Sequence, residues 1–368
     1  MPLIKMQDML EHAQRNAYAI GAFDLTDLNY LKAILDASER TGSPVVLNLR
    51  ESALAHIDLE WMMPAVLAAA KRATVPVAVH FSHGVSVDSA IRAINLGCGS
   101  VMLDGLTKAT GDYIESTGSL AALAHGCDCA VEGLLDLDEL AMPGKVYDCM
   151  AQMKVDSLVL NIESEPQMKR LIDLEPNMTM PLTAYLNIEM GDEHHRRLID
   201  RGVTRICCAT ALIDVVNQRV NELAVSSGAL SLGGLLDVAR TAAGAEVERR
   251  QTLWGCAGRA EQLSAESRPC REVEHLIIYN VDEARDDVVA AMMAEGRKTL
   301  GGIPGVRRIF TGRSVRQDAA YQYCWLVRFS DETVIDSYRD HPDHLAFADT
   351  RFRPIAGDRI SIDYEEVE

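Results

Sequence analysis

The stretch Val77–Ser86 reads VAVHFSHGVS and places His80 and His83 on either side of Ser82. The apolar residues before His80 are typical of a buried strand, and Gly84 with the polar residues around it indicates where that strand ends. Imidazole and hydroxyl groups at such a position can hold a metal ion or transfer protons. The alternative from these residues alone is the capped start of a helix without chemistry.

The strand that carries these histidines belongs to a repeating pattern. Up to about Ser226, short apolar runs alternate with amphipathic helical patterns, and continuous apolar runs are typical of parallel strands buried on both faces. The predicted strands lie within YAIGAFD, SPVVLNLRES, VPVAVHFSH, SVMLDG, CDCAVEGLL, SLVLNIES, PLTAYLNIE and TRICCAT. This pattern predicts a (β/α)8 TIM barrel, and a doubly wound sheet is disfavoured because no GxGxxG motif follows the first strand.

The mouth of such a barrel is where its chemistry takes place, because the carboxyl ends of all strands meet there. The polar residues that the sequence places at these ends are Asp24, Asn48, Arg50, Glu51, Ser82, His83, Asp104, Glu132, Asn161, Glu163, Tyr185, Asn187, Glu189, Cys207, Cys208 and Thr210. Each of them alone has an ordinary structural alternative, such as capping a helix or closing a turn. Their presence at nearly every strand end favours a ligand-binding mouth.

Composition narrows the function classes. The chain has 368 residues and a formal net charge of -18, which disfavours nucleic acids and anionic membrane surfaces as partners, since both need a basic footprint. No apolar run is long enough to cross a bilayer, and the first residues lack the apolar stretch of a signal peptide. The nine cysteines are scattered without a CxxC pair, which predicts reduced thiols in a cytoplasmic protein and no structural zinc knuckle.

A second pattern begins after residues 264–271, which read as a linker. The residues that follow predict the order strand, helix, strand, strand, helix, strand, which is ferredoxin-like. The sequence therefore predicts two domains. The first is the barrel with added C-terminal helices over residues 1–265, and the second is a ferredoxin-like α+β domain over residues 272–368.

The first domain resembles the class II, metal-dependent fructose-bisphosphate aldolases. The resemblance lies in YAIGAFDLTDLNYLKAILDASERTGSPVVL, VPVAVHFSHG, AIRAINLGCGSVMLDG and CAVEG, and it implies a TIM barrel with lyase activity in carbohydrate metabolism. In that family the third strand ends His-x-Asp-His-Gly, where the Asp transfers protons and the second His binds zinc. Here His83 matches the zinc ligand, whereas Ser82 stands in place of the carboxylate.

The zinc and phosphate sites that the resemblance implies are incomplete in this chain. The family's other zinc histidines follow strands six and seven, where the chain reads NIESEPQ and YLNIEMG, with Tyr185 nearest to a ligand position. Catalytic zinc needs about three protein ligands, so we expect no stoichiometric zinc. The glycine loop that cradles phosphate is replaced, strand eight ends Cys207-Cys208-Ala209-Thr210, and no lysine follows strand six to form a Schiff base. We therefore do not expect a zinc-dependent fructose-bisphosphate aldolase.

The predicted roles go to residues that match or replace the family's site residues. Proton transfer and orientation are assigned to Ser82, His83, Asp104 and Glu132. Ligand binding is assigned to Asn48, Arg50, Asn161, Tyr185, Asn187 and Thr210. An arginine at the mouth suits a carboxylate or a phosphate, and the alternative for Arg50 is a salt bridge to Glu51 or Glu132.

Metal binding leaves one alternative open. His83 is the metal ligand that the resemblance supports, and Glu132, Glu163 and Glu189 could join it in a carboxylate-rich site for Mg²⁺ or Mn²⁺. The other interpretation is that these glutamates are ordinary hydrogen-bonded residues.

The second domain resembles stress-responsive dimeric α/β-barrel (Dabb) domains in VEHLIIYNV, IPGVRRIFTG, CWLVRFSDETVIDSYRDHPDHLAFAD and DRISIDYEE. The resemblance implies a barrel formed by two chains and a pocket that contains His275, His341 and His344. Some relatives use the histidine of this motif for aldol-type cyclisation. The alternative is that these histidines have only a structural role.

The predicted function is that of an aldolase-like enzyme acting on a small oxygenated carbonyl or carboxylic acid substrate. Such an enzyme would abstract a proton and cleave or form a carbon–carbon bond. The alternative is a non-catalytic ligand-binding or scaffold protein assembled through its Dabb domain. The expected partners are a small-molecule ligand and further copies of the chain in a homodimer or higher homo-oligomer, with no nucleic acid and no membrane.

Overall fold

The computed structural model describes residues 3–54, 58–105, 109–135, 143–162, 164, 166–167, 180–186, 191–208, 211–227, 231–281 and 286–367. The chain divides into two compact units, of which the larger comprises Met1–Ala90, Cys98–Ala121 and Ala130–Pro269. Most of the smaller unit lies in Cys270–Glu368. The exact domain limits expected from the sequence, 1–265 and 272–368, stay predictions.

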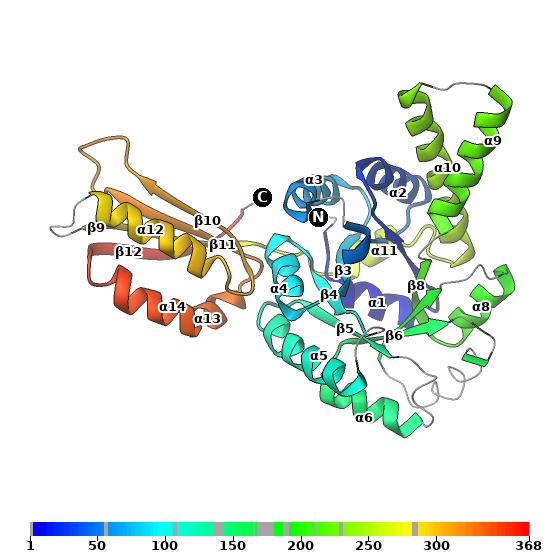
Figure 1. Ribbon diagram of the computed structural model, residues 1–368, viewed down its shortest axis with the longest axis horizontal. Helices are drawn as coiled ribbons and strands as arrows, with labels where there is room; N and C mark the ends of the chain where they lie inside the picture. Colours follow the sequence, from blue (N-terminus) through cyan, green and yellow to red (C-terminus); the bar gives the residue numbers. More distant parts are fainter. Residues whose placement is uncertain are drawn as a thin grey trace. The chain divides into compact units, whose positions relative to one another are not determined.

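Eight parallel strands close the larger unit into a barrel in the order of the chain (Figure 1). They are β1 (Ile20–Asp24), β2 (Val45–Arg50), β3 (Val77–Gly84), β4 (Ser100–Leu103), β5 (Ala130–Leu135), β6 (Ser157–Ile162), β7 (Leu182–Leu186) and β8 (Val203–Cys208). Nearly all of their residues are buried, as expected for strands covered on both faces. The TIM barrel predicted from the apolar runs is confirmed.

Helices surround this barrel (Figure 1). In chain order they are α1 (Met6–Arg15), α2 (Leu28–Thr41), the short η1 (Glu51–Leu54), α3 (Leu59–Arg72), α4 (Val87–Leu96), α5 (Thr110–His125), α6 (Pro143–Met153), α8 (Asp192–Asp200), α9 (Ala211–Ser227), α10 (Leu232–Leu253) and α11 (Ala260–Glu266). The first of the crossover helices, α2, begins at Asp27, whose carboxylate accepts hydrogen bonds from two backbone N–H groups. It ends at Gly42, which has the left-handed conformation (φ 62) that a glycine adopts without strain.

Helix α1 covers the amino end of the barrel. It buries Met6, Met9 and Leu10, and the backbone N–H of Ile4, just before the helix, donates to the carbonyl oxygen of Val77 at the start of β3. The carboxyl ends of the strands are then the side from which a ligand would enter, as in other TIM barrels.

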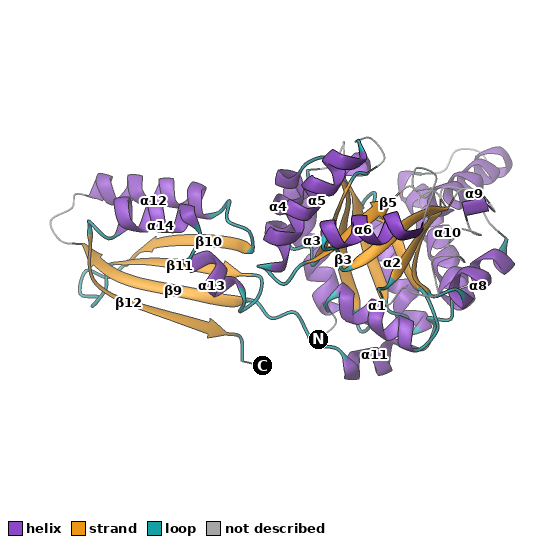
Figure 2. Ribbon diagram, turned by 90° about the horizontal axis from the view of Figure 1, so that it is seen from below, coloured by secondary structure: helices purple, strands orange, loops and turns teal. Residues whose placement is uncertain are grey.

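The smaller unit contains an antiparallel sheet in the order β10-β11-β9-β12, with helices on one face (Figure 2). Its elements are β9 (Val273–Val281), α12 (Asp286–Leu300), β10 (Val306–Arg313), β11 (Tyr323–Phe329), α13 (Val334–Arg339), α14 (Pro342–Phe347), the turn η3 (Ala348–Phe352) and β12 (Ala356–Glu365). Trp325 of β11 is buried beneath the helices, and its ring meets that of Phe347 edge to face at 5.7 Å. The predicted Dabb-type ferredoxin-like fold is confirmed.

None of the helices in the described parts of the two units is long and apolar enough to span a membrane.

Candidate functional site

A β-bulge near the end of β3 shapes the centre of the barrel mouth. The pairing of β3 with β4 shifts register between Phe81 and Gly84, so that Ser82 and His83 share the place of one residue. His83 has a φ of 54°, a left-handed conformation that residues other than glycine seldom adopt. Because a bulge re-aims side chains, two neighbouring residues of one strand can both contribute to the mouth. Strained backbone of this kind is typical of functional sites.

Arg50, the last residue of β2, lies between a carboxylate and an aromatic ring. Its Nε is 3.4 Å from Oδ2 of Asp24 at the end of β1, and its guanidinium carbon is 5.0 Å from the centre of the Tyr185 ring. The carboxylate contacts the guanidinium at Nε and the ring contacts its planar face. The terminal N–H groups of the guanidinium therefore remain available to bind another anion. In the described part of the chain, its ion pair is with Asp24 rather than with Glu51 or Glu132.

His83 lies beside this group. Its Nδ1 is 3.6 Å from Oδ1 of Asp104, and its ring meets the Tyr185 ring edge to face at 5.1 Å. Burial and the charge of Arg50 lower the pKa of His83 to about 4, against the opposing effect of Asp104. The imidazole is therefore neutral near pH 7 and able to accept a proton.

Several polar atoms at the mouth are buried without a hydrogen-bond partner among the residues that the structure describes. They are Oδ1 of Asn48, Nε and Nη2 of Arg50, Oγ of Ser82, Nε2 of His83 and Oη of Tyr185, although Nε of Arg50 lies within ion-pair distance of Asp24. Buried polar groups in folded proteins are nearly always hydrogen-bonded, since desolvation without a partner costs free energy. A concentration of unpaired donors and acceptors at one place therefore indicates a site for a polar ligand.

The carboxyl group of Asp24 is held from two further strands. Nδ2 of Asn48 donates to Oδ1 of Asp24, and Sγ of Cys207 lies 3.9 Å from the same oxygen. Burial raises the pKa of Asp24, although the charge of Arg50 and the hydrogen bond from Asn48 act in the opposite direction. Burial also raises the pKa of the Cys207 thiol well above 9.0, so this cysteine is not a thiolate nucleophile.

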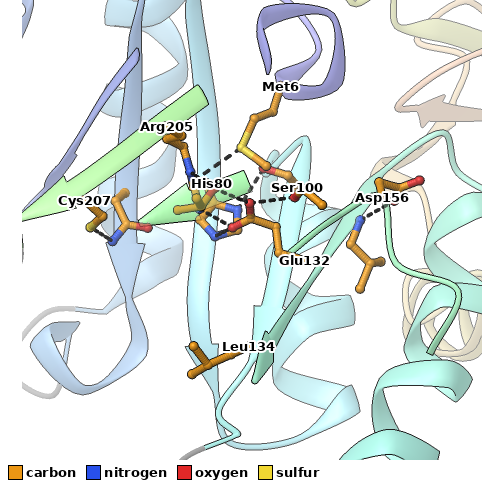
Figure 3. A network of polar contacts seen from close by, with 12 residues as sticks. Met6, His80, Ser100, Glu132, Leu134, Asp156, Arg205 and Cys207 are labelled. Carbon is orange, nitrogen blue, oxygen red and sulfur yellow. Dashed lines mark hydrogen bonds and ion pairs between the residues drawn. The ribbon is translucent and has the colours of Figure 1, made fainter. Parts of the chain in front are cut away.

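Glu132 lies deeper in the barrel, in a separate polar network (Figure 3). Its carboxylate forms an ion pair with the guanidinium of Arg205 and accepts hydrogen bonds from the hydroxyls of Ser157 at 2.8 Å and Thr183 at 3.3 Å. Nε2 of His80 lies 3.1 Å from the carboxylate. All five side chains are almost completely buried.

The amino end of the barrel borders this network. The hydroxyl of Ser100 and a guanidinium N–H of Arg205 both contact Sδ of Met6, in helix α1, at 3.3 and 3.4 Å. Figure 3 shows Met6 on the side of the network away from Leu134. The sulfur lies at the amino-end side, so this layer of polar groups is deeper than the mouth.

The electrostatics of Glu132 follow from these neighbours. Burial alone would raise the pKa of Glu132, but the charges of Arg205 and His80 and hydrogen bonds from His80 and Ser157 lower it from 4.5 to about 2. Burial lowers the pKa of His80. The network therefore contains an ionised glutamate paired with Arg205 and a neutral histidine.

The other residues assigned from the sequence have diverse positions. Glu51 accepts hydrogen bonds from the backbone N–H of Val85 and the hydroxyl of Ser89, so it caps the start of α4. Asn161 is buried in β6. Four residues lie outside the described residues, namely Glu163, Asn187, Glu189 and Thr210.

Several residues of these clusters were not given a role by the sequence, among them Asp24 and Arg205. Asp24 was one polar strand end among many, and no sequence pattern indicates its ion pair with Arg50. The signal for Arg205 was a single charge inside the apolar run TRICCAT, since a charged side chain is rarely buried without a counter-charge.

In the smaller unit, the structure brings two of the three assigned histidines to one tyrosine. The His275 and His344 rings lie 6.3 and 4.4 Å from the ring of Tyr338, and Nδ1 of His275 is 2.6 Å from Oδ1 of Asp363. His341 instead caps α14, since its Nδ1 accepts from the backbone N–H two residues later. A pocket around these residues stays a prediction.

The mouth does not present a zinc site within the described residues. No group of three His, Cys, Asp or Glu side chains that could hold a metal ion is found there. The guanidinium of Arg50 also lies close enough to His83 to lower the pKa of its imidazole, and the same positive charge opposes a divalent cation. The described donor set therefore does not fit the three protein ligands that catalytic zinc needs.

Two family models match the chain. Residues 4–142 match class-II fructose-bisphosphate aldolase, and residues 273–366 match the stress responsive A/B barrel domain, or Dabb.

Among curated proteins, a fructose-bisphosphate aldolase of Stutzerimonas stutzeri is 31% identical over an alignment of 194 residues, and the match covers 44% of this chain and 55% of the relative. A fructose-bisphosphate aldolase of Pseudomonas aeruginosa is 36% identical over an alignment of 143 residues, and the match covers 37% of this chain and 40% of the relative. The chain thus spans about half the length of the curated relatives it matches.

Solved structures resemble the larger unit. The YdjI aldolase of Escherichia coli K12 has a TM-score of 0.65 at 22% identity and covers 70% of this chain and 99% of its own. A fructose-bisphosphate aldolase of Campylobacter jejuni has a TM-score of 0.59 at 14% identity and covers 69% of this chain and 96% of its own. At these identities the likeness shows the fold. Together with the family models, it shows a class II fructose-bisphosphate aldolase-like domain fused to a C-terminal Dabb domain.

Replacing Glu132 with glutamine should lower the free energy of unfolding by about 3–5 kcal/mol, because Arg205 would remain buried without its counter-charge. Chemical denaturation at pH 7 measures this. The control Glu222→Gln, on the exposed side of α9, should change stability little. Equal, small effects of the two substitutions would contradict a structural role for Glu132.

The ion pair between Glu132 and Arg205 also predicts how the free energy of unfolding depends on pH. The pKa of Glu132 is lowered in the folded state, so its contribution is present above 4.5 and is lost as the pH falls from about 4.5 towards 2. The stability difference between the wild type and Glu132→Gln should therefore narrow over that range.

Proposed function

We propose that the larger unit is an aldolase-like enzyme that acts on a small oxygenated carbonyl or carboxylic acid by proton abstraction, with cleavage or formation of a carbon–carbon bond. The observation that carries this proposal is the set of buried polar atoms without partners at the mouth, on Asn48, Arg50, Ser82, His83 and Tyr185. Both donors and acceptors occur in this set, which suits a ligand with an anionic end and oxygen substituents.

Arg50 is the anchor for the acidic end of this ligand. Its guanidinium rests on the Tyr185 ring, and Asp24 contacts it at Nε, so its orientation is fixed before a ligand arrives. Guanidinium groups bind carboxylates with two parallel hydrogen bonds, and the Tyr185 hydroxyl adds a donor next to them. This arrangement lowers the ordering cost of binding.

His83 is the proton acceptor in this proposal. It is neutral near pH 7, Asp104 lies on its Nδ1 side, and its Nε2 has no partner among the described residues. A carboxylate that orients an imidazole through one nitrogen leaves the other nitrogen to take a proton. The Ser82 hydroxyl, next to it in the bulge, orients the reacting oxygen.

For Glu132 we propose a structural role in place of the proton-transfer role predicted from the sequence. Its oxygens already contact Arg205, His80, Ser157 and Thr183, and it is ionised with a pKa of about 2. A general base works best when its pKa lies near the working pH, so Glu132 is poorly suited to proton transfer. We propose that it stabilises the barrel beneath the site.

The competing function is a ligand-binding or scaffold protein without catalysis. It is favoured by Ser82, which stands where the related aldolases have their proton-transferring carboxylate. Both functions need an occupied mouth, and only the first needs His83 as a base. Exchange of substrate C–H hydrogen with deuterated water, lost in His83→Gln, would discriminate between them.

The cytoplasmic location predicted from cysteine usage is retained in this proposal. Most of the nine cysteines are buried, and scattered buried thiols are typical of proteins in a reducing compartment.

The Arg50 proposal predicts that the protein binds a small carboxylate such as pyruvate. Arg50→Leu should weaken this binding by about 10- to 100-fold, the range expected when a hydrogen-bonded charge is lost. Ligand-observed NMR titration measures it, with Arg240→Leu on exposed α10 as the control of equal charge change. Unchanged binding by Arg50→Leu would remove the anchor from the proposal.

The proposed chemistry is independent of zinc. Metal analysis of purified, untagged protein should find well below one zinc per chain, and the protein should not cleave fructose 1,6-bisphosphate efficiently. Stoichiometric zinc that is lost in His83→Ala, together with chelator-sensitive cleavage, would show the opposite.

We further propose that the chain forms a homodimer or a higher homo-oligomer through its Dabb domain. In the sheet register, Leu276 of β9 is paired with Leu326 of β11 and Ile362 of β12, so these side chains share one face. This face is opposite the one that buries Trp325 beneath the helices. Ile362 and Phe310 are 41% and 47% exposed, and contiguous exposed apolar surface of this kind is typical of an interface.

A charge in the centre of this face should prevent assembly. Ile362→Glu should lower the molar mass measured by light scattering at micromolar concentration, because pairing would bury the carboxylate without a partner. Val315→Glu, at a fully exposed residue after β10, should leave the mass unchanged. A monomeric wild type would contradict the proposed assembly.

A further inference from the structure

We infer that Asp24 makes the barrel mouth selective for ligands that carry a single carboxylate and lowers its affinity for phosphate dianions. This inference rests on the proposed function, because it takes Arg50 as the anchor of the ligand. It adds a residue that determines which anions the anchor accepts.

The position of Asp24 is the first argument. Its Oδ2 lies 3.4 Å from Nε of Arg50, and its other oxygen accepts a hydrogen bond from Asn48. The Asp24 side chain is only 10% exposed, so the carboxyl group is fixed within the mouth and is weakly screened by solvent. Any anion bound to Arg50 therefore has this carboxyl group as a close neighbour.

The balance of charge is the second argument. Arg50 supplies one positive charge, and the carboxyl group of Asp24 already lies 3.4 Å from its Nε. The deeper cation, Arg205, is already paired with Glu132. Asp104 adds a further carboxylate beside His83. Among the described residues, the mouth therefore has no excess of positive charge for a phosphate dianion, whose binding sites usually combine several cations or helix N-termini.

Protonation of Asp24 explains why the mouth should bind a ligand with one negative charge more tightly than a ligand with two. Burial raises the pKa of Asp24, opposed by Arg50 and Asn48, with further contributions from Cys207 and Arg205. A bound carboxylate competes with Asp24 for Arg50 and favours uptake of a proton by Asp24. One proton offsets the single charge of a carboxylate, whereas a phosphate dianion leaves a second charge uncompensated.

The test compares two probes that differ mainly in their anionic group, acetate and methyl phosphate, by ligand-observed NMR titration of the full chain at pH 8. The wild type should bind acetate more tightly. Asp24→Asn keeps the shape and a hydrogen-bonding group but removes the charge, and it should shift the affinity ratio toward methyl phosphate by about tenfold or more. The control Asp36→Asn removes the same charge from the exposed surface of α2, and it should leave the ratio unchanged.

The wild type alone provides a second measurement, which does not depend on the folding of a variant. Methyl phosphate loses its second charge below a pH of about 6, so its affinity relative to acetate should rise as the pH falls from 8 to 5. The inference is overturned if the wild type prefers methyl phosphate at pH 8, if the ratio is insensitive to pH, or if a folded Asp24→Asn variant has the same ratio as the wild type.

The outcomes also separate this inference from the proposed function. Acetate binding that is lost in Arg50→Leu but shows no dependence on Asp24 would overturn the selectivity and leave the anchor in place. Acetate binding that is absent in the wild type, or unaffected by Arg50→Leu, would overturn both.

Discussion

The ion pair between Glu132 and Arg205 is the interaction on which the inside of the barrel depends. It joins β5 to β8 and gathers Ser157 of β6, Thr183 of β7 and His80 of β3 around one carboxylate. A carboxylate and a guanidinium that lose their water must compensate each other and also find hydrogen bonds for their remaining polar atoms. The barrel meets this requirement with side chains from neighbouring strands, and its register is thereby tied to its electrostatics.

At the mouth of the barrel, in contrast, several buried polar atoms lack hydrogen-bond partners among the described residues. Ser82 and Tyr185 keep buried polar atoms without partners among the described residues, although each lies only two residues beyond a member of the Glu132 network in the same strand. Arg50, at the end of β2, also has such atoms. The bulge in β3 adds His83 to this layer at the cost of a left-handed backbone conformation. The deeper layer consists of hydrogen-bonded polar groups that stabilise the barrel. The layer at the mouth contains polar groups without partners among the described residues, and these are available to a ligand.

The fold could be predicted from the sequence because buried parallel strands leave a direct mark, namely continuous apolar runs between amphipathic helices. The site could be predicted only in part. Ser82, His83 and Arg50 could be placed at the barrel mouth because the ends of the strands are visible in the sequence. The depth of Glu132 in the barrel and its pairing with Arg205 could not be predicted. They depend on how the strands are aligned with one another, and the two residues are 73 positions apart in the sequence. A bulge leaves no comparable sequence pattern, since it is a relation between two strands.

The sequence distance between the two members of the ion pair affects how the chain folds as it is synthesised. The ribosome releases Glu132 long before Arg205, which follows 73 positions later. Until the last strand has emerged, the carboxylate has no counter-charge, so a partial barrel that buries Glu132 needs either water or a proton at that carboxyl group. Emergence of the eighth strand supplies the guanidinium that allows an ionised Glu132 to be buried without water.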